Sequence, residues 1–250
     1  VEEGADSAFV TSVPTPVPPE SDTRLTGYHD LYLGFHPASG EDRFYGGGGG
    51  GYYVYDVTDL RNPELRATVT GVSGVRWGHT FTPTPDGRYA VAETEYQYAP
   101  LRIFDLKPGL DVEVSNIRRR VAAWHADWRH LAHNHEMRWP FVFVSGYLDG
   151  LQVFHMMDPE NPETVAYYDT NLESMRSNEQ SALRGAFGVD VRNADGLIAV
   201  SDMTTGFWTF RMEGFQGWNG EGWGMPDISS AQKWDAEPAS RTVSPEEDRP

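Results

Sequence analysis

The chain has 250 residues, of which 39% are apolar and 13% aromatic, so it can bury a substantial hydrophobic core. Its formal charge of −17 at pH 7 excludes DNA and RNA as partners, because a polyanion would be repelled. The absence of cysteine excludes disulfides, thiol catalysis and cysteine-ligated metal. No apolar run approaches the ~20 residues that a membrane-spanning helix needs.

The two ends of the chain are rich in Pro, Ser and acidic residues. Residues 1–24 hold the stretch VPTPVPP, and residues 216–250 are Trp/Gly-rich and then acidic. Both contain too little apolar material to offset an ordering entropy of ~1–2 kcal/mol per residue. We therefore expect two arms, of which residues 1–24 and 225–250 should lack regular secondary structure and be ordered only where they touch the body or a partner. Trp218 and Trp223 should pin the start of the C-terminal arm to the body.

Residues 25–215 contain four copies of one pattern. An alternating apolar strand begins at Tyr52, Leu101, Leu151 and Phe207, so the copies are 49, 50 and 56 residues apart, which is the length of a propeller blade. Two strands precede each copy, and an Asp/Pro-rich corner leads to an outer fourth strand. The repeat predicts an all-β propeller of about four visible blades. Either these four close the ring, or further blades or a partner complete it.

Six consecutive glycines, Gly46 to Gly51, fall between the second and third strands of the first unit. A linker would require a domain boundary there. A phosphate-binding loop would require a following helix, whereas YYVYDV has the pattern of a strand. We expect a strand end and a hairpin, where glycine permits positive φ and close backbone approach near the centre of the propeller.

The second unit departs from the repeat in the stretch NIRRRVAAWHADWRHLAH. Val121, Trp124, Trp128 and Leu131 share the spacing of one helical face, which predicts a short inserted helix. The stretch WHADWRHLAHNHE holds four histidines, and an HxxH pair could bind metal only on a continuous helix. A surface insertion is the preferred interpretation, and residues 171–185 look like a second insertion.

His29, His79 and His133 occupy the same position in three successive units, 50 and 54 residues apart. Equivalent inner-strand positions converge at one end of a propeller axis, so we expect these side chains to lie together. They could bind Zn, Cu or Fe. Candidates for a further ligand or base are Asp30, His135 and Glu136. In the alternative interpretation no cofactor is bound and each histidine bonds the backbone of a neighbouring blade. Unit four has Gly188 at this position, which leaves the ring incomplete.

Two other patterns suggest binding chemistry. Glu93 and Glu95 could form a glycosidase-like acid pair, although carboxylates at a loop edge are usually solvated. Several tyrosines could form a carbohydrate platform, although blade packing explains the first three without a ligand. These are Tyr52, Tyr53, Tyr55, Tyr96 and Tyr98.

The stretches GYYVYDVTDLRNPE and DGLQVFHMMDPENPETVAYYDT resemble the LVIVD-repeat β-propeller family. The run HNHEMRWPFVFVSGYLDGLQVF, with GAFGVDVRNADGLIAVSD after it, is similar to the extracellular propellers of the choice-of-anchor B type. The resemblance covers roughly residues 25–215 and implies an exported propeller with no agreed catalytic activity. His155 and Arg211 depart from it, because the family has Asp at this corner.

No acid–base set is assembled by these patterns, so an enzyme is not the preferred interpretation. We expect a non-enzymatic binding or scaffolding propeller, periplasmic or extracellular, acting as an accessory subunit of a larger extracytoplasmic or membrane-associated complex. Its partners would be proteins. The alternatives are a metal-dependent enzyme that uses the histidine ring and a cell-surface carbohydrate or adhesion module.

Overall fold

The computed structural model describes residues 12–13, 15–16, 27–107, 115–171 and 183–226. Most of the two predicted arms, and most of the predicted insertion at residues 171–185, therefore lie outside the described residues. The described part forms four β-sheets and a 3-10 helix, η2 (Gly220–Trp223). None of its helices has the length and apolar character needed to cross a membrane.

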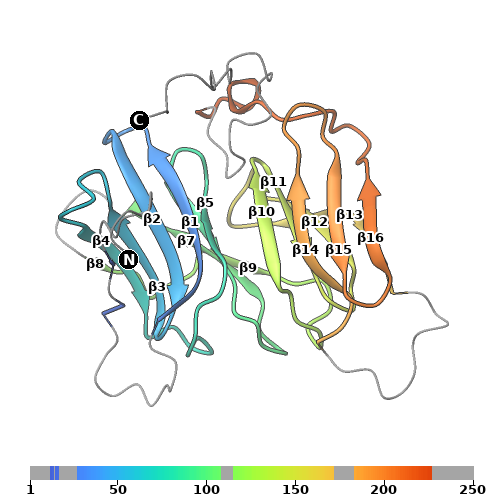
Figure 1. The fold of residues 1–250 in the computed structure, drawn as a ribbon, viewed down its shortest axis with the longest axis horizontal. Coiled ribbons are helices and arrows are strands. Elements are labelled where there is room, and N and C mark those ends of the chain that lie inside the picture. The colour runs from blue at the N-terminus through green and yellow to red at the C-terminus, as the bar shows by residue number, and fades with distance from the viewer. Residues whose placement is uncertain (1–11, 14, 17–26, 108–114, 172–182, 227–250) are drawn as a thin grey trace, which may run out of the picture.

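Each sheet is one blade, in which successive strands pair antiparallel in chain order (Figure 1). Blade 1 contains β1 (Tyr28–His36), β2 (Glu41–Gly48), β3 (Gly51–Asp56) and β4 (Glu64–Thr70), with β8 (Ser115–Asn116) added parallel to β4. Blade 2 contains β5 (Phe81–Pro83), β6 (Tyr89–Ala92), β7 (Leu101–Asp105) and β9 (Ala122–Trp124). Blade 3 contains β10 (Asn134–Arg138), β11 (Phe141–Ser145), β12 (Leu151–His155) and β13 (Glu163–Tyr168). Blade 4 contains β14 (Ala186–Val191), β15 (Ile198–Asp202) and β16 (Gly206–Phe210).

The hydrophobic core lies between the blades. One buried cluster joins blade 1 to blade 2, for example through the rings of Tyr52 and Phe81, which lie 4.9 Å apart. A second joins blade 2 to blade 3, and a third joins blade 3 to blade 4. Among the described residues no such cluster joins blade 4 to blade 1. The fold is an all-β propeller whose four blades pack in series.

The predicted repeat matches the blades. The third strands β3, β7, β12 and β16 begin within one residue of the predicted starts, and each pairs with the strand before it. This confirms the prediction that the four apolar runs are equivalent strands. The predicted outer fourth strand is present in blades 1 and 3 as β4 and β13. In the described part of blade 4, β16 is an edge strand.

The glycine run ends β2 and forms the hairpin to β3, as predicted. Gly50 and Gly51 have φ of 84° and 147°, which most other residues cannot adopt. Gly47 is required for a different reason: a Cβ placed on it would lie 1.6 Å from the carbonyl oxygen of His79 in blade 2. The backbones of two blades therefore meet at this point, next to the propeller axis.

The helix predicted around Val121 to Leu131 is wrong. Residues Ala122–Trp124 form β9, which pairs with β7, and a loop follows. The Trp124 ring stacks on Phe154 at 4.6 Å, and its Nε1 donates to Thr164 Oγ1 at 2.9 Å. Pairing with β7 and burial against blade 3 override the helical spacing of the apolar residues.

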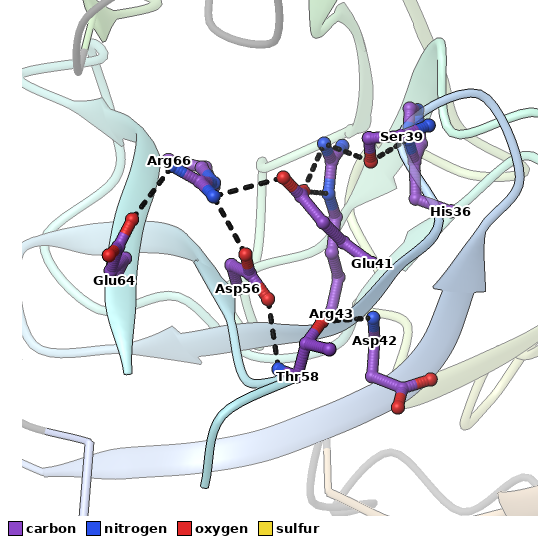
Figure 2. Close-up of polar contacts among 9 residues, drawn as sticks. All are labelled: His36, Ser39, Glu41, Asp42, Arg43, Asp56, Thr58, Glu64 and Arg66. Atoms are coloured by element: carbon purple, nitrogen blue, oxygen red, sulfur yellow. Dashed lines mark hydrogen bonds and ion pairs between the residues drawn. The ribbon is translucent and has the colours of Figure 1, made fainter. Parts of the chain in front are cut away.

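A charged network holds the end of blade 1 opposite to the glycine hairpin (Figure 2). The side chain of Arg43 is 1% exposed, and its Nε donates to Glu41 Oε2 at 2.7 Å. Arg66 Nη2 bonds both Glu41 Oε1, at 2.9 Å, and Asp56 Oδ2, at 2.7 Å. Its Nη1 reaches Glu64 Oε2 at 3.1 Å. The network links β2, β3 and β4.

The strand-end corner keeps its hydrogen bond in blade 3, where histidine replaces aspartate, and has an ion pair instead in blade 4. Asp56 and Asp105 accept from the backbone N–H two residues later, at 2.9 Å in both. In blade 3, His155 Nδ1 accepts from Met157 N at 3.4 Å. In blade 4, Arg211 instead pairs with Asp195, at 2.8 Å. The strands are thus intact where His155 and Arg211 replace the expected aspartate.

The start of the predicted C-terminal arm packs on blades 3 and 4. Trp218 is buried, and its Nε1 donates to the carbonyl oxygen of Trp139 at 2.9 Å. Trp223, in η2, makes an edge contact with Phe141 at 5.7 Å between ring centroids. This confirms the prediction that the two tryptophans attach the arm to the body.

Candidate functional site

The three predicted histidines lie together at the ends of the inner strands. The ring centroids of His29 and His79 are 4.2 Å apart, and those of His79 and His133 are 4.9 Å apart. His29 lies in β1, His79 lies just before β5, and His133 directly precedes β10. Equivalent positions of three blades therefore converge on the axis, as the repeat predicts.

In blade 4 the position equivalent to these histidines is occupied by Phe187. The prediction that Gly188 takes this position is therefore wrong. In β1 the register shifts between Tyr28 and Asp30, which leaves His29 as the bulged residue. In β14 the same shift leaves Phe187 as the bulged residue. The Phe187 ring stacks on His133 with centroids 3.6 Å apart and planes at 24°. An aromatic ring therefore closes the blade-4 side of the cluster.

The residues after the histidines form a second layer that ties three inner strands together. Thr80 Oγ1 donates to Asp30 Oδ2 at 2.8 Å. Asn134 Nδ2 donates to the same carboxylate oxygen and to Thr80 Oγ1, at 3.1 Å in both. These bonds join blades 1, 2 and 3 directly below the histidines.

Glu95 is the site residue that sequence reasoning missed as a ligand. Ligand atoms of His29, His79 and Glu95 all lie within 4.8 Å of one another. His79 Nε2 is 3.7 Å from Glu95 Oε2, and the Tyr147 hydroxyl donates to Glu95 Oε1. Its place in the repeat could have identified it, because Glu95 closely follows β6, and β6 lies beside the inner strand of blade 2.

Burial favours the neutral form of two histidines of the cluster, His79 and His133. Burial, with the nearby His29 and His133, lowers the pKa of His79 to about 4. Burial also lowers the pKa of His133, opposed by its bond to the Phe187 carbonyl. His133 Nδ1 lies 2.6 Å from that oxygen, so this histidine does bond the backbone of a neighbouring blade, as the alternative interpretation proposed.

Glu93 is buried, which contradicts the expectation of a solvated pair. Its exposed fraction is 1%, and neither carboxylate oxygen has a hydrogen-bond partner among the described residues. Burial, with Glu95 and Asp30 nearby, raises the pKa of Glu93 well above its ordinary value. Its neighbour His135, 3.6 Å away, has its pKa lowered to about 3 by burial. Burial therefore favours the neutral form of both groups, which lie 3.6 Å apart.

A cavity of about 470 Å³ continues from the cluster between the inner strands of all four blades. Its wall includes Asp30, Thr80 and Asn134. The predicted extra ligands have other partners: Asp30 belongs to the second layer, His135 lies against Glu93, and Glu136 pairs with Arg138 at 2.9 Å. None of the three belongs to the set formed by His29, His79 and Glu95.

The histidine-rich stretch of unit two is divided between surface and interior. His125 is exposed, and His130 bonds Asp149 Oδ1 at 2.7 Å. His133 and His135 are buried, so the interpretation of the whole stretch as a surface insertion is wrong.

The tyrosines of the predicted carbohydrate platform are also divided between surface and interior. Three of its members are buried in blade 1, while Tyr98 lies exposed beside Trp128, with ring centroids 5.0 Å apart.

No protein-family model matches the chain, and no curated protein matches it. Among solved structures it is similar to the periplasmic gluconolactonase of Pseudomonas aeruginosa, with 14% identity and a TM-score of 0.47 over 73% of this chain and 57% of that one. It is also similar to the β-propeller domain of Cps50 (Swd1) from Myceliophteria thermophila, with 12% identity and a TM-score of 0.44 over 78% and 61%. A third similar structure is the C-terminal WD40 domain of Sif2, with 7% identity and a TM-score of 0.42 over 77% of this chain and 64% of that one. The chain thus spans about three fifths of these structures.

Proposed function

We propose that this protein is a non-enzymatic binding module that docks on another protein through the face of blade 1 that is turned away from blade 2. Leu31 and Leu33 of this face also line the cavity between the inner strands. The observation that carries the proposal is a stripe of exposed apolar side chains on β1. Leu31, Leu33 and Phe35 are 54%, 61% and 46% exposed. Single exposed apolar residues are ordinary on a protein surface, but a contiguous stripe is typical of an interaction site.

The pairing of β1 with β2 places the stripe on the face of blade 1 that is turned away from blade 2. Leu33 pairs with Phe44, and Tyr32 pairs with Tyr45. Paired residues point to the same side of a sheet. Tyr45 belongs to the core shared with blade 2, whereas Phe44 belongs to a separate cluster confined to blade 1 and the segment at Val13.

This face has the composition of a packed blade face. On the same side of the sheet as the stripe, Phe44, Tyr53, Tyr55 and Val57 form a buried cluster, against which Val13 packs. At each of the three contacts between successive blades, the apolar face of one blade is covered by the next blade. A partner that presents an apolar β-sheet surface would cover the stripe in the same way.

The net charge of the chain favours a different protein over a second copy of this chain as the partner. Two copies would each carry −17 and repel one another at close range. The exposed Asp42 pairs with Phe35 across the strands and lies at the edge of the stripe. We therefore infer a partner whose apolar centre is bordered by Lys or Arg. A location outside the cytoplasm, implied by the LVIVD resemblance, remains a prediction.

A photo-crosslinking side chain placed at residue 33 tests this docking in cells that make the protein. We expect one discrete adduct with a different protein, and its loss when Leu31→Glu is added. The matched control is position 167, because Tyr167 is 74% exposed on the outer strand β13 and should give no such adduct. With the partner purified, Leu33→Glu should weaken binding about tenfold or more, and Tyr167→Glu should not.

Two outcomes would overturn the proposal. An adduct between two copies of this chain would show self-association instead of docking on another protein. Equal crosslinking from positions 33 and 167 would show that the stripe is not the binding surface.

Raising the salt concentration should weaken the specific complex, because it screens the attraction between the acidic chain and a basic rim.

A further inference from the structure

We propose that His29, His79 and Glu95 bind one divalent transition-metal ion, with Zn²⁺ as the best match to the ligand set. This inference is independent of docking through blade 1. Two imidazoles and one carboxylate, with a fourth position left for water, form a ligand set found at zinc sites in proteins. His29 lies in β1, His79 just before β5 and Glu95 shortly after β6, so the ion would join blades 1 and 2 at the axis.

The hydrogen bonds of Thr80 determine which nitrogen of His79 carries its proton. Thr80 Oγ1 donates its only proton to Asp30 Oδ2. The same oxygen lies 3.0 Å from His79 Nδ1, so here it must accept, and His79 Nδ1 must donate. Nδ1 is thus engaged with Thr80, and Nε2 is the nitrogen that faces Glu95.

That nitrogen is buried and has no hydrogen-bond partner among the described residues. His79 is 1% exposed, and its Nε2 lies 3.7 Å from Glu95 Oε2. A separation of 3.7 Å is too long for a hydrogen bond, so neither atom satisfies the other. A buried polar nitrogen without a partner is costly, and a cation between the two atoms would remove that cost.

The separation of the two acceptors favours a metal ion over a bridging water. Two ligands held tetrahedrally at about 2.0–2.1 Å from zinc lie roughly 3.4 Å apart. Two groups bridged by one water at about 2.8 Å from each lie roughly 4.5 Å apart. The observed 3.7 Å is closer to the first value.

The surroundings suit ion entry and ligand orientation. His29 is exposed, so its side chain can adjust and the ion can enter from solvent. The buried Tyr147 donates to Glu95 Oε1 and so fixes the carboxylate, as residues that contact metal ligands commonly do. His133 is held by Phe187, so Glu95 replaces it in the predicted set of three ligands.

Metal titration of the chelator-treated full chain tests the proposal. We expect about one Zn²⁺ per chain, and Co²⁺ in its place should show the intense visible absorption of tetrahedral coordination. His29→Ala and Glu95→Gln should each lower the affinity at least about a hundredfold, and Tyr147→Phe about tenfold. His125→Ala is the matched control, because His125 is an exposed histidine outside the cluster, and it should not change the affinity.

The variants at His29 and Glu95 avoid the buried His79, whose replacement could disturb the fold. Thermal unfolding of each metal-free variant should match that of the metal-free parent, which separates loss of a ligand from loss of structure. Unchanged Zn²⁺ affinity in both His29→Ala and Glu95→Gln would overturn the proposal. So would the absence of Zn²⁺ binding by the parent chain, or a Co²⁺ spectrum without tetrahedral absorption.

Discussion

Gly47→Ala is expected to destabilise the protein by about 4 kcal/mol or more, or to prevent folding. The added Cβ would lie 1.6 Å from the His79 carbonyl oxygen, 2.7 Å from its carbonyl carbon and 3.0 Å from the carbonyl carbon of Gly78. All three are backbone atoms of the chain leading into blade 2, so no side-chain rotation can relieve the overlap. Blades 1 and 2 would have to separate, which would also open the buried core between them.

Urea unfolding of Gly47→Ala and Gly27→Ala measures this effect with a matched control. Gly27 also lies at the axial end of blade 1, but a Cβ on it has nothing within 4 Å and its φ is not in the positive range. Its substitution should change the free energy of unfolding by less than about 1 kcal/mol. If Gly47→Ala costs no more than Gly27→Ala, the close approach of the two backbones at this point is wrong.

Glu41→Ala is expected to destabilise the protein by about 3–5 kcal/mol, because it leaves a buried cation without its carboxylate partner. The guanidinium of Arg43 is almost fully enclosed and bonds Glu41 through Nε and Nη2 (Figure 2). Arginine cannot lose its charge at any pH at which the protein is folded. Its other side-chain bond in the network is to Ser39 Oγ, at 3.2 Å, which carries no neutralising charge.

Two further substitutions in the same network serve as a control for Glu41→Ala and as a rescue of its stability. Glu64 bonds Arg66, but its side chain is 56% exposed, so Glu64→Ala should cost at most about 1 kcal/mol. Adding Arg43→Met to Glu41→Ala removes the unpaired charge, and the double variant should be more stable than Glu41→Ala alone. A double variant as unstable as the single one would mean that lost packing, and not an unpaired charge, causes the effect.

Much of the architecture could be predicted because the fold repeats itself along the chain. The third strands alternate apolar and other residues, and their spacing of about 50 residues indicates one blade each. The convergence of His29, His79 and His133 follows from the same periodicity, since equivalent positions on inner strands meet at the axis. The role of the glycines followed from the physical chemistry of the residue itself.

The remaining features depend on contacts that the repeat does not encode. Phe187 takes the histidine position of blade 4 because β14 has the same bulge as β1, with Phe187 in the place of His29, and the pairing that shows this bulge cannot be seen in the sequence. Trp124 lies in a strand because it packs on Phe154 of the next blade, although its sequence spacing is helical. Glu95 reaches His79 across the axial end of blade 2, and Glu93 is buried beside His135 of blade 3. These pairings join parts of the chain that a local pattern cannot relate.

The central claim is that the first two blades bring His29, His79 and Glu95 to one axial site suited to a metal ion. Anomalous diffraction at the zinc absorption edge, from crystals of the full chain grown with equimolar Zn²⁺, tests it most directly. We predict one strong peak about 2.0–2.2 Å from a nitrogen of each histidine and an oxygen of Glu95. A zinc peak at His130 and Asp149 instead, or no peak among the three predicted ligands, would contradict the account.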